Sequence, residues 1–222
     1  MKYFVLLCDG MGDLPMQELG GKTPLEAACT YTMDEFAKVS ELGLCDTSNG
    51  IKPGSDIANM TILGYDPKIY HTGRSPLEAV SIGVKMKETD LVFRCNFVTL
   101  SSEPEYNEKT LVDYSAGEIT TGEARELMKA VQEAFNNEKM AFYAGVSYRH
   151  CLVLHEHEDS YKCTPPHDIT GKPIKEYLPD DAKLLDLMIK SYDILSEHPV
   201  NVARRAKGLN EANSIWLWGE GT

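Results

Sequence analysis

Two turns carry side chains that could bind a metal ion. Asp9 and Asp13 lie in "CDGMGD", which begins at the end of the apolar run Tyr3–Cys8. Carboxylates are the hard oxygen ligands that divalent cations prefer, so Asp9, with Asp13 close behind, could hold such an ion. The alternative, which the spacing alone favours, is an ordinary Asp-Gly turn.

The second turn, "KPGSD", presents Ser55 beside Asp56. A hydroxyl exposed on a tight turn could act as a nucleophile if a bound metal activated it, because an unassisted hydroxyl reacts poorly at neutral pH. The alternative is an N-cap serine that precedes a helical stretch from Ile57 to Leu63. Both interpretations fit the residue types.

Arginine side chains in unusual places could bind an anion, because a planar guanidinium makes bidentate contacts with carboxylates and phosphates. The five candidates precede a helix, lie within or at the start of a strand, or follow a turn: Arg74, Arg94, Arg149, Arg204 and Arg205. A structural ion pair is the alternative for each of them. Helix N-termini at Ser55-Asp56 and at Ser75 would add N–H donors for a phosphate.

Histidines supply further candidates. His167 stands in "CTPPHDITGK", where two prolines stiffen the loop that presents it beside Asp168, and His150 directly follows Arg149. His155 and His157 share one face of a strand and could serve a metal, or belong to a solvated acidic rim.

The pattern of apolar residues predicts the elements that position these side chains. Tyr3–Cys8 is uniformly apolar, which indicates a strand buried on both faces of an α/β sheet, with the Asp9 turn at the carboxyl end where ligands bind. Thr23, Pro24 and Glu26 predict a capped helix that runs to about Leu42. Ser75, Pro76 and Glu78 repeat this pattern, so a second helix is expected there, with Ser75 as its N-cap.

From about residue 84 the pattern changes to an α+β block. Strands are expected over 90–100, 140–146 and 149–156, and helices over 120–136 and 180–198. "ANSIWLWGEGT" then predicts a final buried strand.

Composition excludes several classes of partner. The net charge of −12 and the isoelectric point near 4.9 argue against nucleic acid and anionic membranes, which need a basic surface. The six cysteines contain no C-x-x-C pair, which favours reduced thiols and a cytoplasmic location.

Several motifs together resemble the cofactor-independent phosphoglycerate mutases of the archaeal type, and more closely their bacterial branch, which is also labelled a proposed homoserine kinase. The segments that carry this resemblance occur in the family's order along the whole chain: "LLCDGMGD", "LGGKTPLEAA", "KPGSDIANMTILGYDP", "YHTGRSPLEAVSIGV", "FRCNFVT", "YRHCLVL", "PPHDITGK", "HPVNVARRAKG" and "ANSIWLWGEG". The family belongs to the alkaline phosphatase superfamily.

This resemblance implies an α/β fold: an alkaline-phosphatase-like sheet domain with an inserted α+β substrate-binding domain. The expected boundaries are 1–83 for the first phosphatase-like segment, 84–198 for the insert and 199–222 for the start of the returning segment. The remaining metal ligands of the superfamily would follow Thr222, so the chain is expected to be the N-terminal half and to be inactive alone.

The resemblance also implies a reaction. Asp9 matches a metal-binding aspartate, and Ser55 matches the metal-bound serine that takes the phosphoryl group from 3-phosphoglycerate and returns it to give 2-phosphoglycerate. Two divalent ions (Mn²⁺, Mg²⁺ or Zn²⁺) are implied, and 2,3-bisphosphoglycerate is not. The side chains expected to bind the small phosphorylated acid are Arg94, Arg149, His150, His167, Asp168, Arg204 and Arg205. A phosphotransferase or phosphatase acting on another acceptor such as homoserine, and a non-catalytic ligand-binding module, are the competing functions.

Overall fold

The computed structural model describes residues 1–8, 10–48, 50–51, 54–155, 157 and 161–222. Two compact units divide the chain, residues 1–47 and residues 48–222. Among the described helices, none is both long and apolar enough to span a lipid bilayer.

The described residues of the first unit form the short helices η1 (Gln17–Leu19), α1 (Pro24–Ala27) and α2 (Tyr31–Val39). The predicted capping box at the start of α1 is confirmed: Thr23 and Glu26 exchange side-chain and backbone hydrogen bonds. The prediction of one helix from there to Leu42 is wrong, because Ala28 turns to an extended conformation with ψ of 152°. No described side chain of this unit is buried, so tertiary packing does not hold a longer helix together.

The predicted strand at Tyr3–Cys8 is also wrong. The described residues 1–8 have no regular structure, and Phe4 and Leu6 are each 89% exposed. A strand is stabilised by hydrogen bonds to neighbouring strands and by burial of its faces, and no described strand pairs with this segment. Asp9 itself lies outside the described residues.

The second unit begins with three helices, α3 (Ser55–Ile62), α4 (Pro67–Tyr70) and α5 (Ser75–Ser81). The predicted N-cap at Ser75 is wrong, since Arg74 occupies the N-cap position without a side-chain hydrogen bond. Ser75 is instead the first residue of α5. It is buried, and its hydroxyl donates to the carbonyl of Gly219.

An antiparallel sheet follows, with β1 (Leu91–Leu100) at its centre. On one side β1 pairs with β4 (Arg149–Leu154), and β4 pairs with the edge strand β3 (Met140–Val146). β1 also pairs with β5 (Ser214–Gly221), on its other side, and at its end with β2 (Leu111–Asp113). These pairings confirm the strands predicted around 90–100, 140–146, 149–156 and 212–222, and β5 joins β1 antiparallel.

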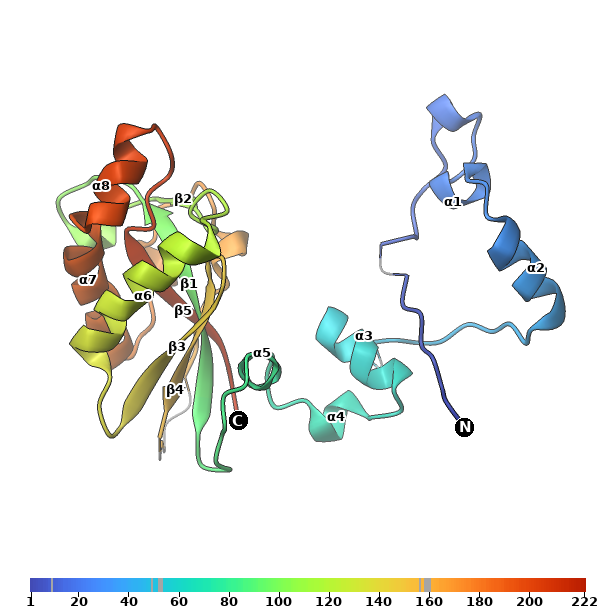
Figure 1. Ribbon diagram of the computed structural model, residues 1–222, viewed down its shortest axis with the longest axis horizontal. Helices are drawn as coiled ribbons and strands as arrows, with labels where there is room; N and C mark the ends of the chain where they lie inside the picture. The colour runs from blue at the N-terminus through green and yellow to red at the C-terminus, as the bar shows by residue number, and fades with distance from the viewer. Residues whose placement is uncertain (9, 49, 52–53, 156, 158–160) are drawn as a thin grey trace. The chain divides into compact units, whose positions relative to one another are not determined.

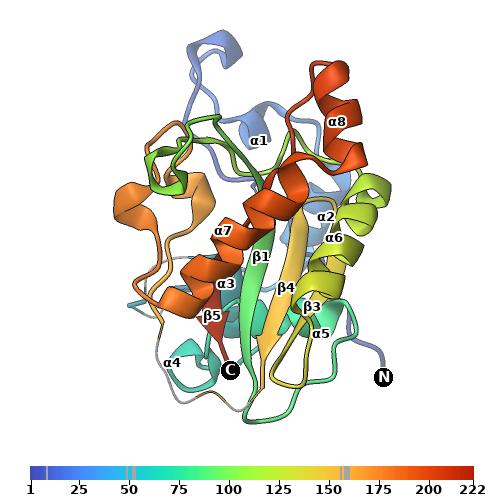
Figure 2. The ribbon, with the colours of Figure 1, turned by 90° about the vertical axis from the view of Figure 1, so that its left-hand side faces the viewer.

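Helices cover one face of this sheet. Figures 1 and 2 show α6 (Thr121–Phe135), α7 (Ala182–Ser196) and α8 (Pro199–Ala206) on that face, and Figure 1 shows α5 on the other. The helices expected over 120–136 and 180–198 are thus confirmed. Between the sheet and its helical layer lies the core, which includes Phe93, Phe97, Leu127, Met188 and Leu217. Each such side chain contributes about 1.5–3 kcal/mol when it leaves water.

Three single-turn helices lie in the connections: η2 (Tyr106–Glu108), η3 (Pro166–Asp168) and η4 (Lys175–Tyr177).

The segment before α5 packs closely against the end of β5. A Cβ on Gly73 would lie 2.6 Å from the Cα of Gly221 and would also clash with the carbonyl oxygen of Glu220. Gly73 has a φ of +141°, which other residues rarely adopt. Thr72, whose hydroxyl donates to the carbonyl of Thr222, adds a second tie at this point.

We expect Gly73→Ala to destabilise the protein by about 2–4 kcal/mol, because the methyl group would force two backbones apart and strain φ. Urea unfolding followed by the fluorescence of Trp216 and Trp218 would measure this loss. The matched control is Gly83→Ala: Gly83 also has positive φ (+83°), but its Cβ would meet nothing within 4 Å. The control should cost only about 1 kcal/mol. Equal losses in the two variants would contradict the close approach at Gly73.

Candidate functional site

Ser55 is the first residue of α3, and it is exposed. Gly54 occupies the N-cap position with an extended backbone, at φ −161° and ψ 156°. The interpretation of Ser55 as an N-cap is therefore wrong, because the helix begins earlier than its apolar pattern indicated. The exposure of Ser55 leaves it open to approach by a substrate.

Asp56 follows Ser55 and pairs with a histidine fifteen positions later in the sequence. The Nε2 atom of His71 lies 2.7 Å from Oδ2 of Asp56, and the two side chains are only 22% and 15% exposed. Burial alone would raise the pKa of Asp56, but hydrogen bonds from His71 and from the N–H groups of Ile57 and Asp56 outweigh it, so the pKa is lowered. This carboxylate thus uses N–H groups that we had expected to be available to a phosphate.

A second group of polar side chains lies on the sheet face opposite α6 and α7. In the strand register Arg94 of β1 lies beside Cys151 of β4 and Trp218 of β5, and Asn96 lies beside Arg149. Side chains alternate along a strand, so these residues share one face. The indole N–H of Trp218 donates to Oδ1 of Asn96 at 3.0 Å, which fixes the orientation of both side chains.

Arg94 is buried at the centre of this face, only 6% exposed. Its guanidinium carbon lies 4.2 Å from the centre of the Trp218 ring, and its Nε lies 2.9 Å from Oε2 of Glu78 without the alignment of a hydrogen bond. Glu78 also pairs with Arg74, whose Nε lies 3.2 Å from Oε1 of Glu78. Burial lowers the pKa of Arg94, and the charge of Glu78 opposes that effect. The side chain still stays charged, because arginine starts from so high a value.

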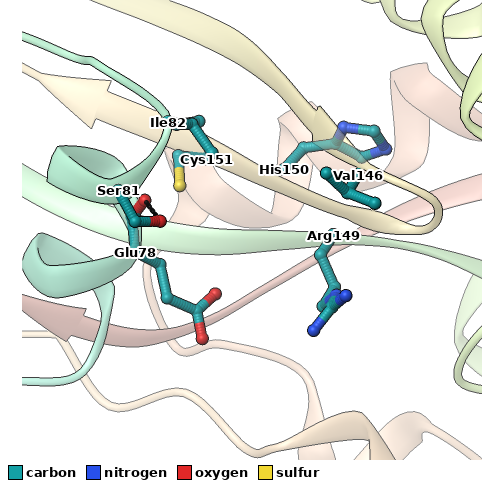
Figure 3. A pocket seen from close by; sticks show the side chains of 7 residues that line it. All are labelled: Glu78, Ser81, Ile82, Val146, Arg149, His150 and Cys151. Carbon is teal, nitrogen blue, oxygen red and sulfur yellow. Dashed lines mark hydrogen bonds between the residues drawn. The ribbon is translucent and has the colours of Figure 1, made fainter.

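A pocket of about 220 Å³ opens beside Glu78. Figure 3 shows the Glu78 and Arg149 side chains directed to the same side of β4. The pocket is lined from α5, from β3 and from β4, by Glu78, Ser81, Ile82, Val146, Arg149, His150 and Cys151. An exposed cation and a half-buried carboxylate at one opening suit a small polar ligand better than an apolar one.

The structure brings His167 to the same face. Its ring packs edge-to-face on Trp218, with centroids 5.2 Å apart, and contacts Tyr114 at 6.2 Å. Its Nε2 lies 3.6 Å from the carboxylate of Asp168, and both side chains are exposed. Arg94, Arg149, His167 and Asp168 are thus the predicted ligands that gather around this sheet face.

His150 lies on the opposite face, where its ring contacts Phe97 at 4.6 Å. Its Nδ1 accepts a hydrogen bond from the N–H of Gly145, so the neutral ring carries its proton on the buried Nε2, which has no partner among the described residues. Burial lowers the pKa of His150 to about 3. The imidazole therefore stays neutral at ordinary pH and packs as a core residue.

Arg204 and Arg205 lie on α8, in the helical layer on the opposite side of the sheet from Arg94. Arg204 is buried and donates to Glu123, to the carbonyl of Ala116 and to the carbonyl of Asn210, each at 2.8 Å. Arg205 pairs with Glu197 and Glu211, at 3.3 and 3.4 Å. Both arginines therefore form structural ion pairs, which was the alternative to anion binding. Their guanidinium groups hold α8 against its surroundings.

His155, the first of the two strand histidines, has an ion-pair partner of its own. Its Nδ1 lies 2.9 Å from Oδ1 of the buried Asp90. Within the described part of the chain, no group of three or more His, Cys, Asp or Glu side chains is placed to hold a metal ion.

Sequence reasoning missed His71, Glu78, Asn96 and Trp218. Asn96 and Trp218 had a usable signal: strand alternation places Asn96 on the face of Arg94, and Trp218 belongs to the final predicted strand. Glu78 had been assigned to a capping box, and His71 had no local signal, since its partner lies in another helix.

Comparisons with known proteins agree with these motifs. Residues 37–201 match the family model described as 2,3-bisphosphoglycerate-independent phosphoglycerate mutase. The chain is 48% identical, over its full length, to the protein of that name from Methanosarcina barkeri and to a probable one from Geobacter sulfurreducens, and covers 56% of each.

Two solved structures are similar to this chain. A cofactor-independent phosphoglycerate mutase from Thermoplasma acidophilum is 28% identical with a TM-score of 0.56, over 96% of this chain and 57% of that one. A protein from Pyrococcus horikoshii is 29% identical with a TM-score of 0.69, over 96% of this chain and 49% of that one.

The chain therefore spans about half the length of the curated relatives it matches. The match to the Methanosarcina barkeri protein covers the whole of this chain, so it includes both the Ser55 turn and the strands of the Arg94 face. The chain belongs to the family of 2,3-bisphosphoglycerate-independent phosphoglycerate mutases.

Proposed function

We propose that the whole protein interconverts 3-phosphoglycerate and 2-phosphoglycerate without 2,3-bisphosphoglycerate, through a phosphoserine at Ser55. The observation that carries this proposal is the exposed Ser55 at the start of α3, in a chain whose family is named for this reaction. An exposed hydroxyl on a helix start can reach a phosphorus atom without rearrangement of the backbone.

The proposed reaction has two phosphoryl transfers. Ser55 Oγ loses its proton and bonds to the phosphorus, the bond from phosphorus to the oxygen on carbon 3 breaks, and that oxygen takes a proton. Glycerate then re-orients within the site. Its hydroxyl on carbon 2 loses a proton and bonds to the phosphorus, the bond from phosphorus to Ser55 Oγ breaks, and Oγ takes a proton. No oxidant or cofactor is consumed.

We propose that the ligands of glycerate lie on the Arg94 face. The buried guanidinium of Arg94 is oriented by Trp218 and Glu78, which lowers the entropic cost of binding a carboxylate. Arg149 and His167 would add charge and hydrogen bonds from β4 and η3, and Asp168 would contact a hydroxyl. Arg204, Arg205 and His150 do not belong to this proposed set, because their contacts hold the helical layer and the core.

The metal proposal extends beyond the described residues. Among these residues, no group of three or more His, Cys, Asp or Glu side chains could hold a metal ion. We propose that two divalent ions (Mn²⁺, Mg²⁺ or Zn²⁺) bind in the whole protein, with Ser55 and Asp9 among the ligands. Such ions would supply stabilisation of phosphoryl charge. Because Ser55 and Asp9 supply only part of this proposed metal site, residues 1–222 should be inactive alone. Substantial turnover by residues 1–222 would contradict the proposal.

We propose that an alkaline-phosphatase-like domain contains residues 1–83 and 199–222 and is interrupted by the insert 84–198. Exposed apolar side chains support this proposal, because a folded domain normally covers them. They lie on α2, α3, α4 and α5, and include Phe36, Val39, Ile62, Ile69, Leu77 and Val80. β5 pairs with β1, so the insert shares its sheet with the returning segment.

The assay that tests the function uses the whole protein with Mn²⁺ and 3-phosphoglycerate, and follows the product by phosphorus NMR. Formation of 2-phosphoglycerate, lost on treatment with a chelator and restored by Mn²⁺, is the expected result. Phosphohomoserine formed from homoserine and ATP, with no mutase activity, would favour the phosphotransferase. Ligand binding without any turnover would favour a binding module.

A further inference from the structure

The pair between Asp56 and His71 connects the turn that carries Ser55 to a different helix. Asp56 is the second residue of α3, and His71 is the C-cap residue of α4. Their side chains meet at 2.7 Å and are mostly buried. Because Asp56 also accepts hydrogen bonds from its own N–H group and that of Ile57, its carboxylate holds the first turn of α3 and His71 together.

Gly54 shows how closely this carboxylate is held to the turn. A Cβ on Gly54 would lie 2.5 Å from Oδ1 of Asp56. The Asp56 carboxylate thus lies next to Gly54, the residue that precedes Ser55. The carboxylate therefore lies close to the backbone before Ser55 and accepts hydrogen bonds from the N–H groups after it.

His71 is itself held in place by the residues that follow it. Thr72 and Ser75 donate hydroxyl hydrogen bonds to carbonyl groups of Thr222 and Gly219, and Gly73 packs against the backbone of β5. Gly219 lies beside the side chain of Arg94. A short path of fixed contacts thus runs from Ser55, through Asp56 and His71, to the strand that borders the Arg94 face.

We propose that His71 is a positioning residue for the Ser55 reaction. By donating to Asp56, it holds the nucleophile turn at a set place relative to the arginine-bearing face of the sheet. This inference rests on the proposed function of Ser55. Displacement of a nucleophile by about 1 Å can cost on the order of 100-fold in rate, so the loss of this one contact should be measurable in catalysis.

The test compares His71→Ala and His71→Gln in the whole protein. In His71→Ala, kcat and the single-turnover rate of Ser55 phosphorylation should both fall about 10- to 100-fold. The KM for 3-phosphoglycerate should stay within about twofold, because the Arg94 face is intact. In His71→Gln an amide N–H can replace the imidazole donor, so at least half of the lost rate, on a logarithmic scale, should return.

His155→Ala is the matched control, because it removes another Asp–His pair, with Asp90, whose loss should leave kcat unchanged. Thermal unfolding of each variant shows whether folding is retained.

The outcomes separate the two hypotheses. Absence of turnover in the wild-type protein would overturn the proposed function itself. Normal wild-type turnover together with an unimpaired His71→Ala variant would overturn only the positioning role. A fall in kcat that glutamine does not relieve, or that His155→Ala matches, would also overturn it, since a general loss of stability would then explain the effect.

Discussion

Replacement of Ser55 by alanine in the whole protein is expected to remove mutase turnover, by on the order of 10⁴-fold or more. The substitution deletes the oxygen that would bond to phosphorus, and no neighbouring hydroxyl occupies the same position at the start of α3. Phosphorylation of the protein by labelled 3-phosphoglycerate, followed by peptide mapping, should find the label on Ser55 in the wild-type protein and nowhere in the variant.

Folding should be nearly unaffected, because Ser55 is exposed and Gly54 occupies the N-cap position. Ser196→Ala is the matched control: this serine lies on α7, where its hydroxyl donates to the carbonyl of Tyr192. It should retain at least half of the wild-type turnover. If Ser55→Ala kept a tenth or more of the activity, the phosphoryl group would have to travel by another route.

Replacement of Arg94 by lysine should have the largest effect on substrate binding. Lysine keeps the charge but loses the planar fork, so one of two hydrogen bonds to a carboxylate disappears. A charge-assisted hydrogen bond is worth about 1.5–3 kcal/mol, which corresponds to about 10- to 100-fold in kcat/KM. The change should appear mainly in KM, measured from initial rates with 3-phosphoglycerate.

The structure also indicates how Arg94→Lys differs from a simple loss of charge. Glu78 keeps Arg74 as its ion-pair partner, so the variant does not leave a carboxylate without a cation. Arg125→Lys is the control, since Arg125 is exposed on α6 and outside this face. A KM that is unchanged in Arg94→Lys would contradict the assignment of Arg94 as a ligand of the substrate.

Much of the fold of residues 84–222 could be predicted from sequence. The strand β1 and the helices α6 and α7 have strong periodic patterns, and each buries its apolar side chains in one shared core. Local sequence also predicted the capping box at Thr23, because both partners lie within one turn. The segment Tyr3–Cys8 was predicted wrongly, since apolar character alone does not supply the neighbouring strand that a buried strand requires.

The residues of the candidate site were also predictable from sequence only in part. The sequence made His167 a candidate through its rigid, proline-rich loop and Arg94 through its position inside an apolar strand, and the structure places both at one sheet face. Sequence could not distinguish Arg204 from Arg94, because the partners of Arg204, Glu123 and Ala116, lie more than 80 positions away from it. An arginine that is saturated by structural contacts and one that packs on Trp218 beside Glu78 have the same local pattern.

The sequence by itself determined the family, the strands β1, β3, β4 and β5 and the helices α6 and α7, and it proposed Ser55 as the nucleophile. These depend on motifs and periodicities that are local in the chain. Only the tertiary structure decided which polar side chains share a face: it joined Arg94 to Glu78 and Trp218, moved Arg204 and Arg205 to the opposite layer, and paired Asp56 with His71. The physical reason is that burial and ion pairing depend on distances in space, between residues whose separation in sequence carries no signal.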